Sequence, residues 1–271
     1  MSGILAKNSG ILNCTGGVDM TRERNTEKKK FNKKNLAWII PLAVVIVFAL
    51  AMLLYTSVYY RADGTAKEAL KSDERVTVTE EDFGWFFDGP GTAGQAMIFF
   101  PGGKVEETSY APLLRLLANN GVDVFLLRAP MKLVIFNYDK AGEIMKRYDY
   151  RHWYLAGHSL GGTAASFFAA EHGDRVEWLF LLASYSTEEL PKDLKVSSLY
   201  GSEDGVLNMN SYQICKKNLP ESAQEYVIEG GNHSQVGSYG HQRGDGEAKI
   251  TSEEQTKKTA ELILQMIMPF G

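Results

Sequence analysis

Residues 36–58 form an uncharged apolar run that constrains this chain more than any other feature. About 23 consecutive positions, LAWIIPLAVVIVFALAMLLYTSV, contain no charged side chain. An α-helix of that length reaches about 34 Å, whereas the hydrocarbon core of a bilayer is about 30 Å thick. A helix also satisfies its own backbone hydrogen bonds where water is absent. We therefore predict a transmembrane helix over residues 36–58, with the lipid bilayer as its partner.

The charges that flank this run predict its orientation. Before the run lies a basic cluster of Lys28, Lys29, Lys30, Lys33 and Lys34. After it, Arg61 and Lys67 are nearly balanced by Asp63 and Glu68. By the positive-inside rule, residues 1–35 lie in the cytoplasm, and their polar, Asn-, Lys- and Gly-rich sequence predicts disorder. Everything after the run then lies outside, in a single-pass protein of the cell membrane.

Two other interpretations of the apolar run are open. A cleaved signal peptide usually has a shorter apolar stretch, a shorter leader and a small-x-small cleavage site, and these features are not clear here. A core helix of a soluble protein would normally include polar residues over this length. Whether the N-terminal segment is cleaved is left open by the sequence.

Composition excludes several classes of protein. The net charge of −4 leaves no overall positive field, so nucleic acid is not expected as a partner. The two cysteines, Cys14 and Cys215, lie on opposite sides of the apolar run, which excludes a disulfide framework. No histidines or carboxylates show metal-ligand spacing, and no metal is expected. The oligomeric state is left open.

From residue 75 onward, short apolar runs alternate with segments of helical period. Strands are expected at 75–78, 84–87, 96–100, 122–127, 153–156, 176–183, 198–200 and 225–228. Helices are expected at 110–120, 137–148, 163–172, 209–218 and 252–268, the last with Ser252 and Gln255 in a capping box. Continuous apolar strands are typical of a mostly parallel sheet covered by helices on both faces. This predicts one α/β domain at 75–271, joined to the apolar run by a linker at 59–74.

A glycine-flanked serine lies where one predicted strand meets a helix of small residues. The segment is Gly157-His158-Ser159-Leu160-Gly161, and G-x-S-x-G in this context is typical of a nucleophilic serine on a sharp turn. Glycine is needed two residues away on either side, because side chains there would collide with the neighbouring strand and helix. We predict Ser159 as a nucleophile and not as an incidental serine of a glycine-rich turn.

A serine hydroxyl needs a base, and His233 is the best placed of the five histidines. It follows the strand at 225–228 in Gly230-Gly231-Asn232-His233, ahead of the last helix. His241, in the polar loop that follows, is the alternative base. His158 precedes the serine and is expected to serve in packing.

The base in turn needs a carboxylate to hold its tautomer. The strand at 198–200 ends in Gly201-Ser202-Glu203-Asp204-Gly205, and a turn just beyond a strand is where such an acid belongs. We predict Asp204, with Glu203 as the alternative. Nucleophile, acid and base then follow one another along the chain in a known order.

Developing negative charge on a substrate oxygen requires two backbone N–H groups. One is expected from Leu160, the residue after the nucleophile. The other is expected from the turn Pro101-Gly102-Gly103-Lys104, which follows the strand at 96–100. We favour the amide of Gly103, because glycine lets the backbone approach a substrate closely, with the amide of Lys104 as the alternative.

Together, FPGG at 100–103, GHSLGG at 157–162, GSEDG at 201–205 and GGNH at 230–233 resemble the α/β-hydrolase superfamily. The chain is similar to small bacterial single-domain hydrolases with an N-terminal membrane segment, over about residues 75–270. The resemblance implies an α/β-hydrolase fold and cleavage of a carboxylic ester or similar acyl bond through an acyl-enzyme, without a cofactor. Pro101 stands where many relatives carry histidine, which leaves the geometry of the oxyanion loop open.

The resemblance also bears on the shape of the site. Larger relatives insert a helical lid between the strands predicted at 176–183 and 198–200, where this chain has room for about 15 residues. We expect no large lid and an open site, with Lys104 and Tyr185 as candidate contacts to a small-molecule acyl substrate. Two alternatives remain: an acyltransferase with the same triad, and a catalytically silent fold used as a binding module. Acyl chain length and leaving group are not predicted.

Overall fold

The computed structural model describes residues 33–91 and 94–268, and side chains from residue 37 onward. It contains two compact units, residues 1–50 and 51–271. The first unit, in its described part, is the beginning of helix α1 (Lys33–Ser57). Residues Ala37–Ser57 are long and apolar enough to cross a membrane by length and composition. Large side chains such as Trp38 and Leu54 are 81% and 68% exposed, which would be costly in water.

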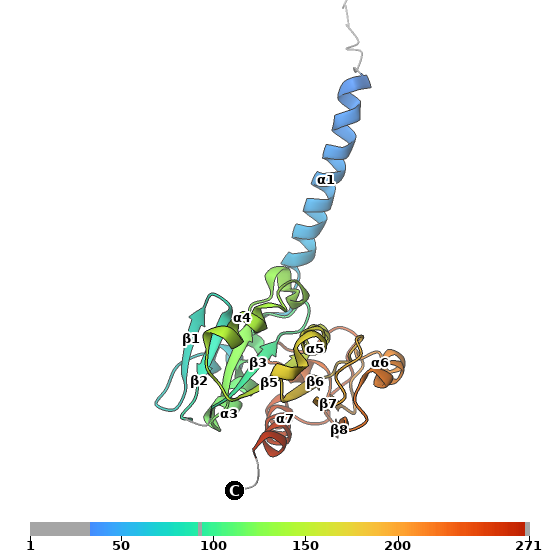
Figure 1. Cartoon of the computed structure of the whole chain (residues 1–271). Helices are drawn as coiled ribbons and strands as arrows, with labels where there is room; N and C mark the ends of the chain where they lie inside the picture. The colour runs from blue at the N-terminus through green and yellow to red at the C-terminus, as the bar shows by residue number, and fades with distance from the viewer. Residues whose placement is uncertain (1–32, 92–93, 269–271) are drawn as a thin grey trace, which may run out of the picture. The chain divides into compact units, whose positions relative to one another are not determined.

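An eight-stranded sheet forms the centre of the second unit (Figure 1). The strands are β1 (Thr77–Glu81), β2 (Gly84–Asp88), β3 (Gln95–Phe100), β4 (Asp123–Leu127), β5 (His152–His158), β6 (Trp178–Leu182), β7 (Lys195–Gly201) and β8 (Gln224–Ile228). Their order is β1-β2-β4-β3-β5-β6-β7-β8. The opening strands β1 and β2 are antiparallel, and β4, β3, β5, β6, β7 and β8 run parallel. The predicted α/β-hydrolase fold with a mostly parallel sheet is confirmed.

Helices cover both faces of this sheet. They are α2 (Gly64–Ala69), α3 (Ala111–Asn119), α4 (Lys140–Arg147), α5 (Leu160–His172), α6 (Met209–Cys215) and α7 (Ser252–Ile267). Adjacent residues of β3 belong to opposite cores: Phe99 packs with α3 and α7, whereas Ile98 packs with α4 and α5. Because successive side chains of a strand point to opposite faces, both faces must be apolar, which explains the continuous apolar strands.

Two connections bear directly on the site. Residues 183–194, between β6 and β7, contain no helix, so the prediction of a fold without a large lid is confirmed. Residues 59–74, predicted as a linker, pack on the domain: they include α2, and Ala62 and Ala66 are buried. Tyr60 pairs with Val105 as an isolated parallel bridge.

The capping box of the last helix lies one residue earlier than predicted. Thr251 is the N-cap, and its hydroxyl and the Glu254 side chain each accept a hydrogen bond from the other's backbone N–H. The predicted pair of Ser252 and Gln255 is therefore wrong by one residue. Gln255 is instead fully buried, and its amide bonds both the N–H and the carbonyl of Asn232, at 2.9 and 2.8 Å. Helix α7 thus holds the loop that carries His233.

The capping box predicts which of two neighbouring hydroxyl groups stabilises α7. We expect Thr251→Ala to lower the free energy of unfolding by about 1 kcal/mol, because it removes the acceptor for the Glu254 amide. Ser252→Ala is the matched control and should change it by less than about 0.5 kcal/mol. Urea unfolding of the full-length protein in detergent measures both values, and an equal effect of the two variants would contradict this cap.

Candidate active site

Ser159 occupies a strained turn between β5 and α5. Its backbone has φ 53° and ψ −125°, a region that a residue with a side chain rarely adopts. A Cβ at Gly157 would overlap the backbone of Gly161, and one at Gly161 would overlap the carbonyl of Phe100. Only glycine at both positions lets strand and helix approach closely enough to hold this turn. The hydroxyl of Ser184 also donates to the Ser159 carbonyl at 2.6 Å.

Asp204 and His233 form a buried pair at the ends of β7 and β8. The distance from His233 Nδ1 to Asp204 Oδ2 is 2.9 Å, and both side chains are 1% exposed. The other carboxylate oxygen accepts the N–H groups of Val206 and Leu207 at 2.9 and 2.8 Å. A carboxylate held in this way requires the proton on Nδ1, which leaves Nε2 of His233 free to accept one. Among the described residues, Nε2 has no hydrogen-bond partner.

Ser159 and His233 border the same cavity of about 250 Å³. Its walls are Ser159, Leu160, Thr163, Ala183, Ser184, Tyr185, Val206, Leu207, Asn208 and His233. The fold therefore brings together the nucleophile, base and acid that were predicted from separate motifs. Tyr185 also borders this cavity. Lys104 does not, because its ammonium group lies 4.3 Å from the centre of the Tyr55 ring.

The turn after β3 distinguishes between the two candidate oxyanion amides. The N–H of Lys104 donates to the carbonyl of Lys132 at 2.8 Å, and that of Gly102 donates to the hydroxyl of Tyr110 at 3.0 Å. The N–H of Gly103 makes no hydrogen bond within the described part of the chain, and its Cα lies against Leu160. Gly103 therefore has the free donor beside the first residue of α5, where helix N–H groups also lack intrahelical acceptors.

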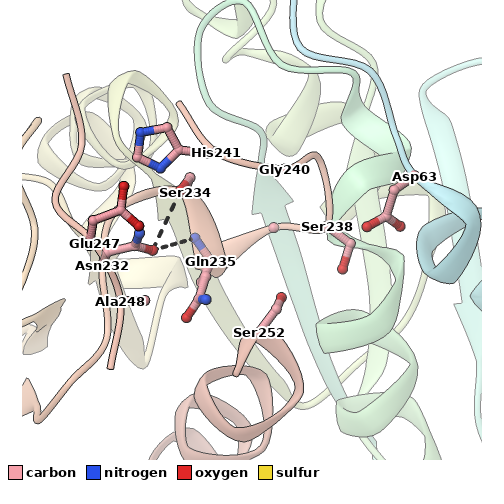
Figure 2. Close-up of a pocket in the computed structure, with 11 residues that line it drawn as sticks. Asp63, Asn232, Ser234, Gln235, Ser238, Gly240, His241, Glu247, Ala248 and Ser252 are labelled. Atoms are coloured by element: carbon pink, nitrogen blue, oxygen red, sulfur yellow. Dashed lines mark hydrogen bonds between the residues drawn. The ribbon is translucent and has the colours of Figure 1, made fainter. Parts of the chain in front are cut away.

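Glu203 and His241, the alternative acid and base, lie outside the cavity that Ser159 borders. Glu203 forms an ion pair with Lys249 at 2.7 Å, away from His233. His241 borders a second, polar cavity of about 260 Å³. Figure 2 shows His241 near Glu247 and Asn232 at one end of this cavity and Asp63 at the other end. Asn232 accepts hydrogen bonds there from the Ser234 hydroxyl and the Gln235 N–H. Neither alternative residue lines the cavity that contains Ser159.

Asp245 is a partly buried carboxylate that sequence reasoning missed. Its oxygens accept the N–H groups of Gly205, His233 and Ser234 at 3.1, 3.2 and 2.8 Å, and the Ser234 hydroxyl at 2.7 Å. It thereby ties the loop after Asp204 to the loop of His233. Burial raises the pKa of Asp245, but the bonds from Ser234, Gly205 and His233 outweigh it and leave the pKa below its ordinary value. Asp245 lies in a polar, glycine-rich loop with no period, and no signal in the sequence distinguishes it from the other acidic residues there.

His158 links the oxyanion loop to the base, beyond the packing role predicted for it. Its Nδ1 lies 2.8 Å from the Tyr110 hydroxyl, which already accepts the Gly102 N–H. With the Gly102 N–H as its donor, we assign the Tyr110 hydroxyl as donor to Nδ1, and the neutral His158 ring then carries its proton on Nε2. The ring centres of His158 and His233 are 4.5 Å apart. Burial lowers the pKa of His158 well below 6.5, and the nearby His233 lowers it further, against a smaller backbone contribution.

The Asp245 bonds predict a stability cost for loss of its charge. We expect Asp245→Asn to lower the free energy of unfolding by about 2 kcal/mol or more, because a neutral amide turns its NH₂ toward backbone donors. Glu247→Gln, an exposed neighbour in the same loop, should change it by less than about 0.5 kcal/mol. Denaturant unfolding of the full-length protein compares them, and equal stability of Asp245→Asn and wild type would contradict the role of this carboxylate.

The pKa of His158 predicts a loss of stability at mildly acidic pH. Because the folded-state pKa lies below 6.5, the unfolded chain takes up the proton first as the pH falls. Above about pH 7.5, His158 should not change the free energy of unfolding with pH. Below about pH 6.5, it should lower that free energy progressively, by at most about 1.4 kcal/mol per pH unit. We expect a shallower pH dependence for His158→Gln and an unchanged one for exposed His241→Gln, from unfolding curves at pH 7.5 and 5.5. An equal change in the free energy of unfolding between these two pH values in His158→Gln and wild type would refute this role of His158.

Three solved structures show the same fold. Carboxylesterase CesB from Bacillus subtilis covers 82% of this chain and 99% of its own, at 10% identity and a TM-score of 0.51. A predicted CIB-like hydrolase from Thermoplasma acidophilum covers 69% and 98%, at 14% identity and a TM-score of 0.50. A bacterial membrane phospholipase A covers 86% and 98%, at 13% identity and a TM-score of 0.53. At these identities the likeness concerns the fold.

Sequence comparison identifies the family. No curated protein matches the sequence significantly. The model of the alpha/beta hydrolase family matches residues 96–257, which is more than half of the chain and includes the segments that carry Ser159, Asp204 and His233. With this match and the fold described above, the chain belongs to the alpha/beta hydrolase family.

Proposed function

We propose that this chain is a serine hydrolase that cleaves a carboxylic ester or similar acyl bond through Ser159, His233 and Asp204. The observation that carries the proposal is the buried pair of His233 and Asp204, at 2.9 Å, beside the cavity that Ser159 borders. If Asp204 and His233 had only structural roles, nothing would require His233 to border the same cavity as Ser159 with a ring nitrogen that has no hydrogen-bond partner among the described residues. No cofactor is required for this reaction.

The reaction proceeds by acyl transfer to water. Nε2 of His233 takes the proton of Ser159 as its Oγ attacks the substrate carbonyl, and Asp204 stabilises the imidazolium that forms. The N–H groups of Leu160 and Gly103 bind the oxyanion. His233 then protonates the leaving group, and the acyl-enzyme remains. Finally His233 deprotonates a water molecule, which attacks the acyl carbon and releases the acid and free Ser159.

The proposed location of this reaction is the outer surface of the cell membrane. The exposed apolar side chains of α1 support an anchor, and the basic cluster before it, which lies outside the described residues except for Lys33 and Lys34, supports a cytoplasmic N-terminus. The catalytic domain then faces outward. The acceptor is water in this proposal, and an alcohol or amine acceptor would make the same machinery an acyltransferase.

The test is the reactivity of the Ser159 hydroxyl. We expect the full-length protein in detergent to hydrolyse p-nitrophenyl acetate and to be labelled covalently by a fluorophosphonate. Ser159→Ala should abolish the labelling and lower kcat by about 10³-fold or more, because the nucleophile is lost. Ser211→Ala, whose hydroxyl lies on α6, is the matched control and should keep both properties.

Two outcomes would count against the proposal. Labelling that persists in Ser159→Ala would mean that another residue is the nucleophile. A folded wild-type protein that is neither labelled nor active would favour a catalytically silent binding module. Added primary alcohols, with the transesterified product measured, separate hydrolysis from acyl transfer.

A further inference from the structure

We propose that the substrate is an ester-linked, anionic membrane lipid, taken from the bilayer that holds the anchor. This rests on the hydrolase function and the membrane anchor proposed above, and it adds the class of substrate and the surface that receives it. Three features of the domain carry it: the attachment of the oxyanion loop to the end of the anchor, an exposed apolar rim, and a cluster of cations on aromatic rings.

The chain that leaves α1 pairs at once with the oxyanion loop. The helix ends at Ser57, and the N–H and carbonyl of Tyr60 bond the carbonyl of Lys104 and the N–H of Glu106, both at 2.8 Å. The Glu106 carboxylate also accepts the N–H of Ala62 at 3.0 Å. Three extended residues reach at most about 10 Å. Because Lys104 directly follows Gly103, the reaction centre is held close to the point where the chain would leave the bilayer.

Exposed apolar side chains gather around the same loop. Outside α1, the exposed large apolar residues of the described chain are Val58, Met131, Phe136, Met209, Ile214 and Val227, of which the last two lie elsewhere, on α6 and on the edge strand β8. Met131 and Phe136, 45% and 62% exposed, flank Leu133, which lies beside Gly103. Met209 follows Asn208, a wall of the Ser159 cavity. Val58, Met131, Phe136 and Met209 make up the apolar rim, and an exposed apolar surface of this kind is typical of a site that meets a membrane or a partner.

Cations and tyrosine rings cluster beside this apolar rim. Lys104 lies over the ring of Tyr55, at 4.3 Å, and Arg61 and Lys132 lie over that of Tyr59, at 5.2 and 4.9 Å. Lys132 is paired with Glu107, whereas neither Lys104 nor Arg61 forms an ion pair within the described ranges. Tyrosine with lysine and arginine is the composition of a membrane interface and favours anionic headgroups. The cluster of basic residues is therefore a local feature, because the whole chain has a net charge of −4.

The size of the cavity agrees with a substrate that stays partly in the bilayer. Its volume of about 250 Å³ is below the roughly 300–1,000 Å³ of pockets that enclose a whole ligand. No helical lid spans residues 183–194 to enclose a second part of the substrate. The cavity can accept the ester group and a short part of the chain, while the remaining acyl surface lies along the apolar rim and in the lipid.

The experiment places an ester-linked probe lipid in a bilayer whose other lipids have no ester bonds. Full-length protein is reconstituted into vesicles of ether-linked phosphatidylcholine, which it cannot hydrolyse, with 10 mol% of ester-linked phosphatidylglycerol or ester-linked phosphatidylcholine as probe. Released fatty acid is measured, with p-nitrophenyl acetate hydrolysis followed in parallel. We expect fatty acid from both probes, at least fivefold faster from phosphatidylglycerol at low salt, and none from Ser159→Ala.

Rim and control variants test the surface itself. Met131→Ser with Phe136→Ser should lower the ratio of lipid hydrolysis to p-nitrophenyl acetate hydrolysis about tenfold, because the apolar rim is lost. Val227→Ser, an exposed apolar residue of β8, should leave this ratio unchanged. Arg61→Gln should reduce the preference for phosphatidylglycerol.

The outcomes separate this inference from the function on which it rests. Hydrolysis of p-nitrophenyl acetate without release of fatty acid from either vesicle would overturn the lipid substrate and leave the hydrolase intact. Equal rates with the two probes would overturn the anionic preference, and an unchanged ratio in the double rim variant would overturn the surface. Failure with every ester, in folded protein, would count against the hydrolase itself.

Discussion

The parallel alignment of β5, β6, β7 and β8 as neighbours in one sheet is the constraint on which the rest of the structure depends. Parallel strands end at the same edge, and a ligand site of an open α/β sheet lies outside that edge. Ser159 follows β5 directly, and Asp204 and His233 follow β7 and β8 within short turns. Residues from distant parts of the chain therefore meet without a long connection. A one-residue slip of a central strand would exchange the side chains that pack in the two cores, so the packing of both cores also fixes the position of the site.

Much of this arrangement could be predicted from the sequence because its signals are local. Continuous apolar runs indicate strands buried on both faces, and glycines two residues from Ser159 indicate a backbone turn that only glycine permits. The order of Ser159, Asp204 and His233, each just after a strand, predicts that the three side chains meet at one edge. The capping box was misplaced by one residue because Thr251-Ser252 offers two adjacent hydroxyls, and only the helix start decides which one caps.

The remaining interactions join segments that carry no periodic signal. Asp245 lies in a polar loop with several glycines and charges, where sequence alone does not identify the carboxylate that accepts bonds from the loop of His233. Tyr110 and His158 are distant in sequence, and their bond becomes visible only when β3 and β5 are side by side. The same holds for Tyr60, whose partner Val105 lies in the loop after β3. Such contacts depend on tertiary geometry and not on local propensity.

The bridge between Tyr60 and Val105 has a consequence for any separation of the domain from helix α1. Proteolytic shedding and recombinant truncation both favour an exposed, unpaired stretch of chain between an anchor and a folded unit. Here Val58 and Tyr59 alone separate the last turn of α1 from that bridge, and α2 then packs onto the domain. A fragment that starts at residue 75 would lose both, together with the hydrogen bonds from Tyr60 that hold Lys104 and Glu106 in the loop after β3. Residues 58–70 are in this sense part of the fold of the domain, and a stable fragment without α1 would have to keep them.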